Sequence, residues 1–520
     1  MKHFLKLSVF ICGMATMAIE MTASRMIGNV FSAANLVWAG IIGSILLFLA
    51  AGNWLGGKVS SRFKDNKTLF LIILIAGISC SLIPVAARPL LNLSSKAMDQ
   101  LQFSSILLFF ILILLLLFIP MTNLGMITPL ALSLSKKDPG SEASNDNNES
   151  GKILALSTIG SFFGTFLPVF FLIPQFGSNR SFFLIGFILI LTAGIGLFFE
   201  NKSFGFLLFL ILLLPLLLYL FFPKSIKSSN GQLYEKESAY NYIEVMQDSG
   251  FTMLKLNDGQ AIQSIYKADV DNYYGPWEQI LTAPFLSRCP VSPAEIEHGA
   301  VLGAAGGTSV RQLLKVFPNI QVDGFEIDPE ITSAAAAYFD LPTENYTVRH
   351  IDGRIGLQNS SKLYDVIMVD AYHPPYIAAN MSTVEFFKIA ARRLKPDGVL
   401  MMNIGRSEND RRLLNAITAT VSQVFPEMMV VDIPNAYNSI LFAQNTRNSL
   451  DNLRCNYEQL SSDSETPILL LETLSAALGN HKPVETDSAM IFTDDSAPVE
   501  IMTNQTIFGA FFSQDKKEEN

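Results

Sequence analysis

Long apolar runs dominate the first 222 residues of the chain. Seven segments are almost free of charged side chains, at 5–22, 35–55, 68–87, 104–122, 153–174, 181–199 and 204–222. Since about 20 apolar residues cross the hydrocarbon core of a bilayer as one helix, this pattern predicts a bundle of about seven membrane-spanning helices. The first segment carries Glu20 and is followed by further spans, which is not typical of a cleavable signal peptide.

The hydrophobic period changes after Phe222. A polar linker leads into short alternating strands, YIEVM, FTMLKL and AIQSIY, which are separated by the turn sequences DSG and NDG. From residue 299 onward, apolar strands alternate with helix-like stretches, which predicts a mainly parallel, doubly wound Rossmann-like sheet. We therefore expect a transmembrane bundle at 1–222, a linker with a small antiparallel β unit at 223–270, and an α/β transferase-type domain at 271–520.

Charge separates the two halves further. Only 16% of the residues are charged, and the net charge is +6 up to Phe222 and −15 after it. Because phosphate backbones are bound by clustered cations, the acidic second half argues against nucleic acid as a partner. The bilayer is the expected partner of the first half.

Two signals in the sequence disagree on the membrane side of the second half. One set of loops carries Lys2, Lys6, Lys58, Arg62, Lys64, Lys67, Lys136, Lys137, Lys152 and Lys202, and the other carries Arg25, Arg88, Lys96, Arg180, Lys224 and Lys227. Cytoplasmic loops are the more basic ones, so seven spans would place the second half outside. Because nucleotide-type cofactors are cytoplasmic, we expect instead one miscounted span near 104–134 and a cytoplasmic domain in a multi-pass cell-membrane protein. The alternative is that the second half faces out.

The four cysteines suggest no framework. Cys12 and Cys80 lie in apolar segments, and Cys289 and Cys455 each stand alone. With no CxxC motif and no Cys/His cluster, the sequence predicts no metal site and unpaired thiols in a reducing compartment.

The first two predicted strands of the α/β domain end in residues that suit a nucleoside ligand. Gly303-Ala-Ala-Gly306-Gly307 allows a ligand close to the backbone at the start of a helix. Glu326, about 20 residues further on, ends the next strand in the sequence FEIDPE, where an acidic side chain typically binds ribose hydroxyls. Together they predict a nucleoside pocket at the carboxyl edge of the sheet.

Two further strand ends add carboxylates. Asp352-Gly353 follows the third strand, where the carboxylate could accept the amino group of an adenine. Asp370 ends YDVIMVD and is followed by Ala-Tyr372-His373-Pro-Pro. A carboxylate at a strand end beside a bound nucleoside suits a general base or a group that orients an amine.

These motifs resemble the spermidine synthase (polyamine aminopropyltransferase) family over residues 240–445. The resemblance is carried by the order YNYIEV, LNDGQAIQS, GAAGGTSVR, FEIDPEI, DGR, YDVIMVDAYHP and LKPDGVL. AIEMTASRMIG near the start and TDDSAPVE near the end resemble membrane-fused spermidine-synthase-like proteins. The resemblance implies an enzyme whose donor is S-adenosylmethionine or its decarboxylated form, with a small amine or another polar molecule as acceptor, and homodimers are among its expected assemblies.

The resemblance also implies a set of site residues. Asp370 is the expected base, with Tyr372 and His373 orienting the acceptor. The donor-binding set is Gly303, Gly306, Gly307, Glu326, Asp328, Asp352 and Gly353, and the substrate-binding set is Gln263, Trp277 and Glu278.

Several family positions that hold cationic amines are changed. The family loop reads GGGDGG, and we place its acid at Gly306 here; its D-x-x-D becomes Asp370-Ala-Tyr-His373. The family's Tyr and the His or Gln after it align with Pro276 and Trp277, so that only Glu278 of that trio remains. Because a diamine needs paired carboxylates, two alternatives to aminopropyl transfer stay open. One is an S-adenosylmethionine-dependent methyltransferase, and the other is a polyamine transporter or sensor with a non-catalytic soluble module.

Overall fold

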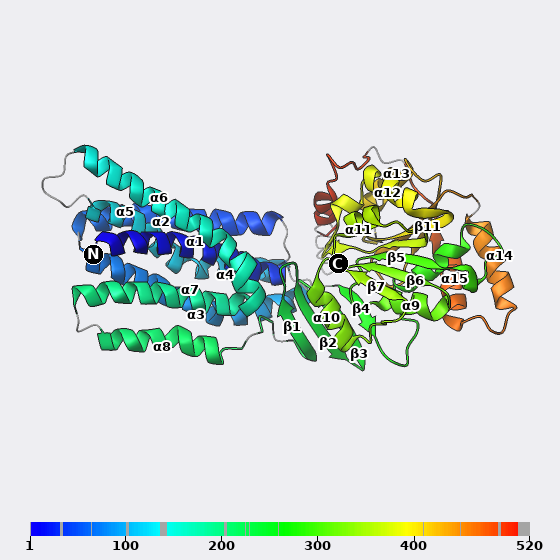
Figure 1. Ribbon diagram of the computed structural model, residues 1–520, viewed down its shortest axis with the longest axis horizontal. Helices are drawn as coiled ribbons and strands as arrows, with labels where there is room; N and C mark the ends of the chain where they lie inside the picture. The colour runs from blue at the N-terminus through cyan, green and yellow to red at the C-terminus, as the bar shows by residue number, and fades with distance from the viewer. Residues whose placement is uncertain are drawn as a thin grey trace, which may run out of the picture. The chain divides into compact units, whose positions relative to one another are not determined.

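The chain forms two compact units. The computed structural model describes residues 2–31, 35–63, 65–99, 103–135, 143–201, 205–223, 225–227, 229–257, 259, 261–408, 410–447, 449–486 and 490–507. The helical unit comprises Met1–Asn230 with Glu235–Tyr242, and the α/β unit comprises Gly231–Tyr234 with Ile243–Asn520. Figure 1 shows the elements of each unit.

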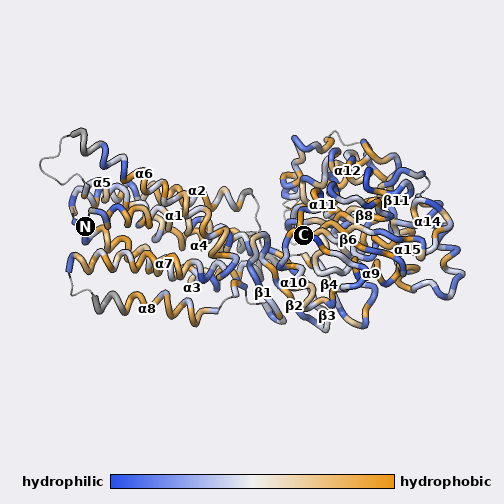
Figure 2. The backbone as a smooth tube through the Cα atoms, in the orientation of Figure 1, coloured by the Kyte–Doolittle hydropathy of each residue, from blue (hydrophilic) through white to orange (hydrophobic). Residues whose placement is uncertain are grey.

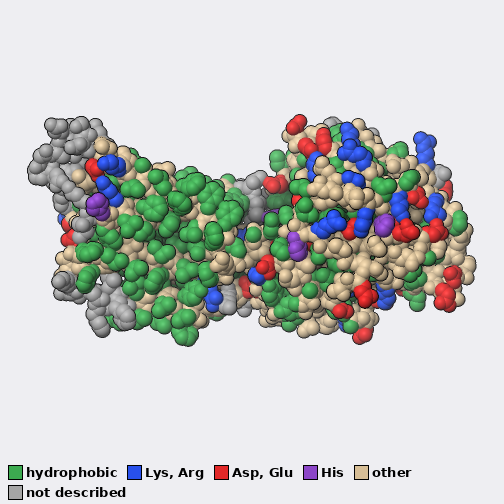
Figure 3. Space-filling view, viewed as in Figure 1, with side chains coloured by type: hydrophobic (Ala, Val, Ile, Leu, Met, Phe, Trp, Pro, Cys, Tyr) green, Lys and Arg blue, Asp and Glu red, His purple; other side chains and the backbone are tan. Residues whose placement is uncertain are grey.

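The helical unit consists of long apolar helices, which Figure 2 shows in the colour of hydrophobic residues. They are α1 (Lys2–Phe31), α2 (Asn35–Arg62), α3 (Asn66–Asp99), α4 (Phe103–Leu116), α5 (Phe118–Ser135), α6 (Ala143–Leu167), α7 (Ile173–Glu200) and α8 (Gly205–Phe221). Within the described residues, five helical stretches are long and apolar enough to cross a membrane. Hydrophobic side chains cover much of the visible face of this unit in Figure 3, as expected for a surface that meets lipid rather than water.

The longest of these stretches, Asn148–Glu200, contains two helical segments that run in opposite directions. Its regular helix is interrupted at Gly177, where φ is 78° and ψ is 166°. Before the break, α6 runs parallel to α1, since Lys6 pairs with Glu149 at 2.6 Å and Gly160 and Gly164 of α6 lie against the backbone of Phe10 and Met14. Glycines permit this close approach between helix backbones.

After the break, α7 returns in the opposite direction. Near its start, Ser178 shares the carboxylate of Glu237 with Asn29 at the end of α1. At its own end, the ring of Phe199 lies 5.8 Å from that of Phe4, at the start of α1. We call these two ends of the helical unit the Asn29 end and the Lys6 end.

The α/β unit contains a small sheet and a large one. The small sheet has the order β1-β2-β3-β4, with β1 (Gln232–Glu237), β2 (Tyr242–Asp248), β3 (Phe251–Leu256) and β4 (Ile262–Tyr266). The large sheet has the order β14-β12-β13-β11-β8-β5-β6-β7. Its strands are β5 (His298–Leu302), β6 (Gln321–Phe325), β7 (Tyr346–Arg349), β8 (Tyr364–Val369), β11 (Leu394–Gly405), β12 (Glu427–Asp432), β13 (Asn438–Gln444) and β14 (His481–Lys482).

The five strands β7, β6, β5, β8 and β11 are parallel, and β13, β12 and β14 extend the sheet antiparallel beyond β11. Alternate residues of β8 enter different cores: Val366 and Met368 pack with α14 (Ser449–Ser461) and α15 (Ile468–Asn480), while Ile367 and Val369 pack with α12 (Val384–Arg393) and α13 (Arg412–Val421). Two apolar faces explain why the central strands read as continuous hydrophobic runs. The predicted fold class, a helical bundle followed by a Rossmann-like domain with a small antiparallel sheet before it, is confirmed.

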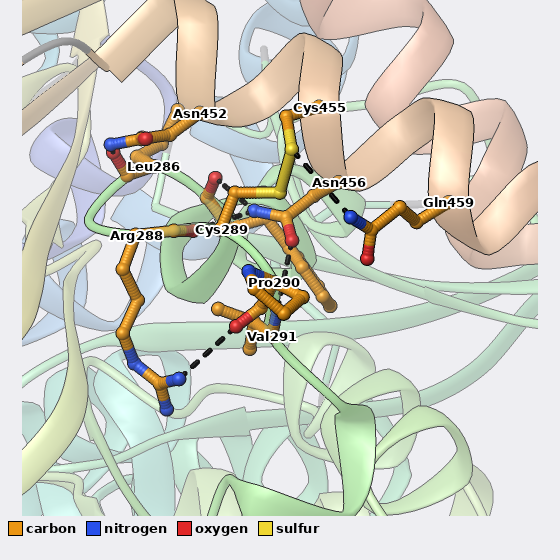
Figure 4. Close-up of a disulfide and its surroundings, with 10 residues drawn as sticks. Leu286, Arg288, Cys289, Pro290, Val291, Asn452, Cys455, Asn456 and Gln459 are labelled. Atoms are coloured by element: carbon orange, nitrogen blue, oxygen red, sulfur yellow. Dashed lines mark hydrogen bonds between the residues drawn. A yellow bond between two sulfur atoms is a disulfide. The ribbon is translucent and has the colours of Figure 1, made fainter.

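The expectation of unpaired thiols is wrong for two of the four cysteines. Cys289, after the 3₁₀ helix η3 (Glu278–Phe285), forms a disulfide with Cys455 of α14 across a sequence separation of 166 residues (Figure 4). The same two segments are joined by Asn456, whose amide donates to the carbonyls of Phe285 and Arg288 and whose oxygen accepts from the amide of Val291. Cys12 and Cys80 are free and buried in the helical unit.

Candidate active site

The predicted ligand-binding edge lies at the point where the sheet order reverses. β5 is flanked by β6 on one side and by β8 on the other, so the chain builds outward from β5 in both directions. Ligands of open α/β sheets bind at such a switch point, beyond the carboxyl ends of the strands. Here the two adjacent strand ends are Gly303, after β5, and Asp370, after β8.

Gly303 is packed against the end of β8. Its φ is +86°, and a Cβ atom at this position would collide with the carbonyl oxygen of Asp370. The backbone amide of Asp370 in turn donates to the carbonyl of Leu302 at 2.9 Å. Only glycine meets both demands without strain, so the loop and the candidate base are held together.

The rest of the loop turns sharply into α9 (Thr308–Val316). Ala305 has a φ of 46°, and Gly307, with a φ of +76°, precedes the first turn of the helix. The exposed amides of a helix start favour a negative or polar ligand atom. The amides of Gly303, Ala305, Gly306 and Gly307 already donate to other groups of the protein. The loop therefore contributes a close approach of its backbone rather than a row of free donors.

Glu326 joins the loop to the end of β6. One carboxylate oxygen accepts from the amide of Ala305 at 3.1 Å, and the other accepts from the amide of Asp328 at 3.1 Å. Burial raises the pKa of Glu326 to about 7, while these backbone hydrogen bonds act in the opposite direction. Each oxygen keeps acceptor capacity, which is what ribose hydroxyls would need.

The other donor-set carboxylates also begin helices. Asp328 caps α10 (Pro329–Tyr338) by accepting from the amide of Glu330. Asp352 caps α11 (Gly353–Asn359) by accepting from Ile355, and its second oxygen accepts from the amide of Asn380 at 3.1 Å. Asp328 is fully buried and Asp352 half-buried, so Asp352 is the better placed of the two to meet a ligand.

Asp370 is held from the neighbouring strand. Its Oδ1 accepts from the side-chain amide of Asn403 at 3.0 Å, and the Oδ1 of Asn403 accepts from the amide of Asn438 at 2.9 Å. Burial raises the pKa of Asp370 to about 6, and the hydrogen bond from Asn403 acts in the opposite direction. A carboxylate oriented in this way and titrating near neutrality suits proton transfer.

Tyr372 and His373 occupy different environments. The hydroxyl of Tyr372 donates to the carbonyl of Asn403 and accepts from the amide of Gly405, both at 3.0 Å. This hydroxyl braces the end of β11, so an acceptor would meet the ring edge rather than a free hydroxyl. His373 is exposed and lies in the short hairpin of β9 (Tyr372–His373) and β10 (Tyr376–Ile377).

The three predicted substrate-binding residues lie close to one another. The indole NH of Trp277 donates to the backbone carbonyl of Gln263 at 3.2 Å. Glu278 is buried, and its carboxylate accepts from the amides of Tyr273 and Gly275 and from the side chain of Gln312. Glu278 therefore fixes the 273–275 turn, whereas Gln263 and Trp277 are half-buried.

The loop position that corresponds to the family's acid needs correction. Gly306 donates its amide to the hydroxyl of Ser264 at 2.8 Å, and a Cβ atom here would lie only 2.7 Å from the Cβ of Ser264. No side chain fits at this position. Matching the final glycine pair of GGGDGG to Gly306-Gly307 places the acid at Ala305, so the loop still lacks an acid but at a different residue.

Two positioning residues escaped the sequence analysis. Asn403 sits in the apolar run GVLMMNI, where a polar residue at a strand end was the available signal. Arg311 donates to the carbonyls of Gly306, Phe339 and Ile265 and so ties the loop to β4 and to the end of α10. Because these partners are backbone carbonyls rather than carboxylates, they leave no charge pattern in the sequence.

The C-terminal segment braces the Asp352 loop. Arg354 forms a two-pronged ion pair with Asp494, with both nitrogen–oxygen distances at 2.7 Å, and Thr383 donates to the same carboxylate. Arg354 also donates to the carbonyl of Asn380, whose side chain bonds to Asp352. The TDDSAPVE motif is thus connected to the candidate donor site through two residues.

Comparisons with known proteins bear on this domain. A family model described as "Spermine/spermidine synthase domain" matches residues 289–452. The chain is 35% identical over 285 residues to a probable polyamine aminopropyl transferase of Bifidobacterium longum, covering 52% of this chain and 61% of that protein. It is 26% identical over 308 residues to a polyamine aminopropyltransferase of Vibrio vulnificus, covering 56% of this chain and 98% of that protein.

A solved structure is similar over the same region. The crystal structure of a probable spermidine synthase from Corynebacterium glutamicum is 21% identical, with a TM-score of 0.38, and the match covers 50% of this chain and 99% of that one. The chain spans less than two thirds of the Bifidobacterium relative. The second half of the chain is therefore similar to spermine/spermidine synthase domains, with the family model matching residues 289–452.

Proposed function

We propose that the chain is an integral membrane transferase that moves an aminopropyl group from decarboxylated S-adenosylmethionine to an amine acceptor. The observation that carries the proposal is the pairing of Asp370 with the Gly303 loop at the switch point of a spermidine-synthase-type sheet. The relatives from Bifidobacterium longum and Vibrio vulnificus are named as a probable polyamine aminopropyl transferase and a polyamine aminopropyltransferase, which supports the same reaction.

The proposed reaction is a displacement at a sulfonium. The acceptor nitrogen attacks the aminopropyl carbon bonded to sulfur, the carbon–sulfur bond breaks, and its electron pair neutralises the sulfur as a thioether. The attacking nitrogen loses one proton, which Asp370 accepts in its ionised form. Holding nitrogen, carbon and sulfur in line is the larger part of the catalysis.

The donor would be held by the neighbouring strand ends. Glu326 would accept the ribose hydroxyls and Asp352 the adenine amino group, with the amides of the Gly303–Gly307 loop beside the rest of the donor. The acceptor would enter past Trp277, Gln263 and His373. The side chains of Asp328, Glu278 and Tyr372 would act indirectly, since each forms hydrogen bonds with other groups of the protein.

Methyl transfer from intact S-adenosylmethionine is the second candidate. One observation favours it: the loop has Ala305 where the family carries an acid, and His373 replaces the second carboxylate after β8. Without these acids, the pocket lacks the groups that would attract the donor's free amine and reject the donor's carboxylate.

The experiment that decides is a donor comparison with the purified full chain in detergent. We expect product by mass spectrometry from the decarboxylated donor with a diamine, and a loss of about 10²- to 10⁴-fold in kcat for Asp370→Asn. Methylated product from the carboxylated donor would establish the alternative. No product from either donor, together with polyamine uptake into vesicles, would favour a transporter or sensor.

The proposed partners are the small amine and the bilayer. The five long apolar stretches of the helical unit favour the bilayer as a partner. A homodimer remains a prediction, which light scattering of the detergent-solubilised chain would test. The cytoplasmic side expected from the sequence rests on the usual location of nucleoside donors.

A further inference from the structure

We propose that the α/β unit lies on the non-cytoplasmic, oxidising side of the membrane and acquires its Cys289–Cys455 disulfide there. The inference does not depend on which group the enzyme transfers. It rests on the direction of the helices, on the distribution of basic residues between the two ends of the helical unit, and on the covalent bond itself.

The chain runs between the Asn29 end and the Lys6 end of the helical unit an odd number of times. α2 starts at the Asn29 end, directly after α1, and α5 runs parallel to it, since Phe118 packs on Phe48 and the backbone of Met126 lies against Gly56. α3 runs antiparallel to α7, because Asn66 bonds to Glu200 and the thiol of Cys80 to the carbonyl of Phe182. Both ends of each helix are thereby assigned.

The last helix of the unit ends at the Asn29 end. The ring of Phe222, just after α8, lies 5.6 Å from that of Phe183, and Tyr219 lies under the guanidinium of Arg180, both near the start of α7. Within the described residues, the chain therefore runs between the two ends seven times, in α1, α2, α3, α4 with α5, α6, α7 and α8, although α8 has 17 residues and is shorter than the five long stretches. This odd number argues against the miscounted span that the sequence analysis preferred.

The segment that follows the last helix also shows at which end the chain leaves the helical unit, without any count of helices. Glu237 accepts from Asn29 at 2.9 Å and from the hydroxyl of Ser178 at 2.7 Å, and Arg25 donates to the carbonyls of Ser238 and Tyr240. These residues all belong to the helical unit. The chain passes from this anchored segment directly into Ile243, so the α/β unit follows from the Asn29 end.

The basic residues place the opposite end in the cytoplasm. Among the described residues, the Lys6 end carries Lys6, Lys58, Arg62, Lys67 and Lys152, whereas the Asn29 end carries Arg25, Arg88, Arg180 and Lys227. In the sequence, the two sets of loops to which these residues belong hold ten and six Lys and Arg residues. Cytoplasmic loops are enriched in Lys and Arg. The Asn29 end, and with it the α/β unit, is then non-cytoplasmic.

The disulfide agrees with this placement. Disulfides form and persist in oxidising compartments, whereas cytosolic thiols are kept reduced. Cys289 and Cys455 are the only cysteines after residue 80, and the Asn456 contacts hold their segments together, as Figure 4 shows. The disulfide therefore supports a non-cytoplasmic location of the α/β unit.

The placement constrains how the substrates arrive. A sulfonium nucleoside and a polyamine are both cations, and charged groups cross a hydrocarbon core only at high cost. Both would be drawn from the non-cytoplasmic pool, so a transport step must supply the donor.

Two measurements on the full chain in a bacterial host test the proposal. The first uses a Cys12→Ala/Cys80→Ala background, in which acid-quenched cells are treated with a polyethylene glycol maleimide in denaturant. We expect no gel shift without a reductant and a shift of two additions after reduction. Two additions without reduction would overturn the proposal.

The second measurement reads the membrane side through matched single cysteines in the same background. Ser462→Cys lies after α14 and its control Ser61→Cys lies near the end of α2, and both positions are exposed. In spheroplasts treated with a membrane-impermeant maleimide, we expect Ser462→Cys to be labelled at once and Ser61→Cys only after permeabilisation. The reverse pattern overturns the proposal whatever the activity of the enzyme.

Discussion

The side-chain amide of Asn403 points at the carboxylate of Asp370 from the adjacent strand and donates a 3.0 Å hydrogen bond to it. The same asparagine accepts from Asn438 on β13, so three strands set the orientation of one carboxylate. A hydrogen bond to the charged form lowers the pKa of an acid. The proposed base is thereby kept partly ionised despite its burial.

Asn403→Leu is expected to move the acid limb of kcat/KM to higher pH. The wild-type limb should lie near pH 6, because burial raises the pKa of Asp370 to about that value. Removing the donated hydrogen bond removes a stabilisation of the ionised form, which predicts a shift of about one pH unit. Asn438→Ala serves as the graded control, since it leaves the Asn403 amide in place and should shift the limb less. A limb that stays fixed in both variants would exclude Asp370 as the titrating base.

Glu326→Gln should weaken donor binding and stabilise the fold above neutral pH. The pKa of Glu326 is raised to about 7 in the folded chain, so the folded state binds more protons than the unfolded state between about pH 4.5 and pH 7. The free energy of unfolding therefore falls as the pH rises through this window, and the penalty is full above it. The neutral variant avoids this penalty, a gain on the order of 3 kcal/mol at pH 8.

The comparison of two pH values isolates this effect. Thermal unfolding at pH 8 should show the stabilisation, whereas at pH 4 both proteins carry a neutral side chain and should unfold alike. An equal gain at both pH values would mean that packing, and not ionisation, separates them. Donor titration by calorimetry should show the accompanying loss of affinity.

Ala305→Asp should shift donor preference toward the decarboxylated form. Ala305 already has a φ of 46°, a region that Asp tolerates better than Ala. A carboxylate at this loop position would attract the free aminopropyl amine and repel the carboxylate of intact S-adenosylmethionine. We expect the ratio of kcat/KM for the two donors to change at least about tenfold. Ala305→Asn matches the size without the charge, and an equal change in that variant would contradict the electrostatic explanation.

Cys289→Ser and Cys455→Ser should destabilise the α/β unit to the same extent. The disulfide closes a loop of 166 residues, and loss of a native disulfide costs about 2–5 kcal/mol. The double variant should be no less stable than either single one, because the two side chains make one bond. Limited proteolysis over a temperature series measures the effect, and added reductant should reproduce it in the wild type but not in the variants.

Much of the fold could be predicted from local patterns. Apolar runs of membrane length and the regular alternation of strands and helices are signals that each segment carries by itself. The strand-end residues Gly303, Glu326, Asp352 and Asp370 could be listed in the same way, since parallel strands bring their carboxyl ends to one edge. Their roles in binding and catalysis, and the domain boundaries at 222 and 270, stay predictions.

The rest depends on contacts between distant segments. No pattern in the sequence around Cys289 predicts that it pairs with Cys455, which lies 166 residues away on a helix. The role of Asn403 requires knowing that β11 lies beside β8, and the lack of room at Gly306 arises from Ser264 on another sheet. The sequence shows a glycine at position 177, but it does not show that the chain reverses its direction there. That reversal is evident only from the antiparallel packing of α7 on α3.

The Asn456 contacts bear on how the chain is assembled. They join the segment around residues 285–291 to α14 by hydrogen bonds that do not involve sulfur, so the same contacts would bring the two thiols of a reduced chain close together. The remaining cysteines, Cys12 and Cys80, are shielded within the apolar helices. Cys289 and Cys455 then have only each other as accessible partners in the chain. Correct oxidation would therefore need no disulfide isomerase.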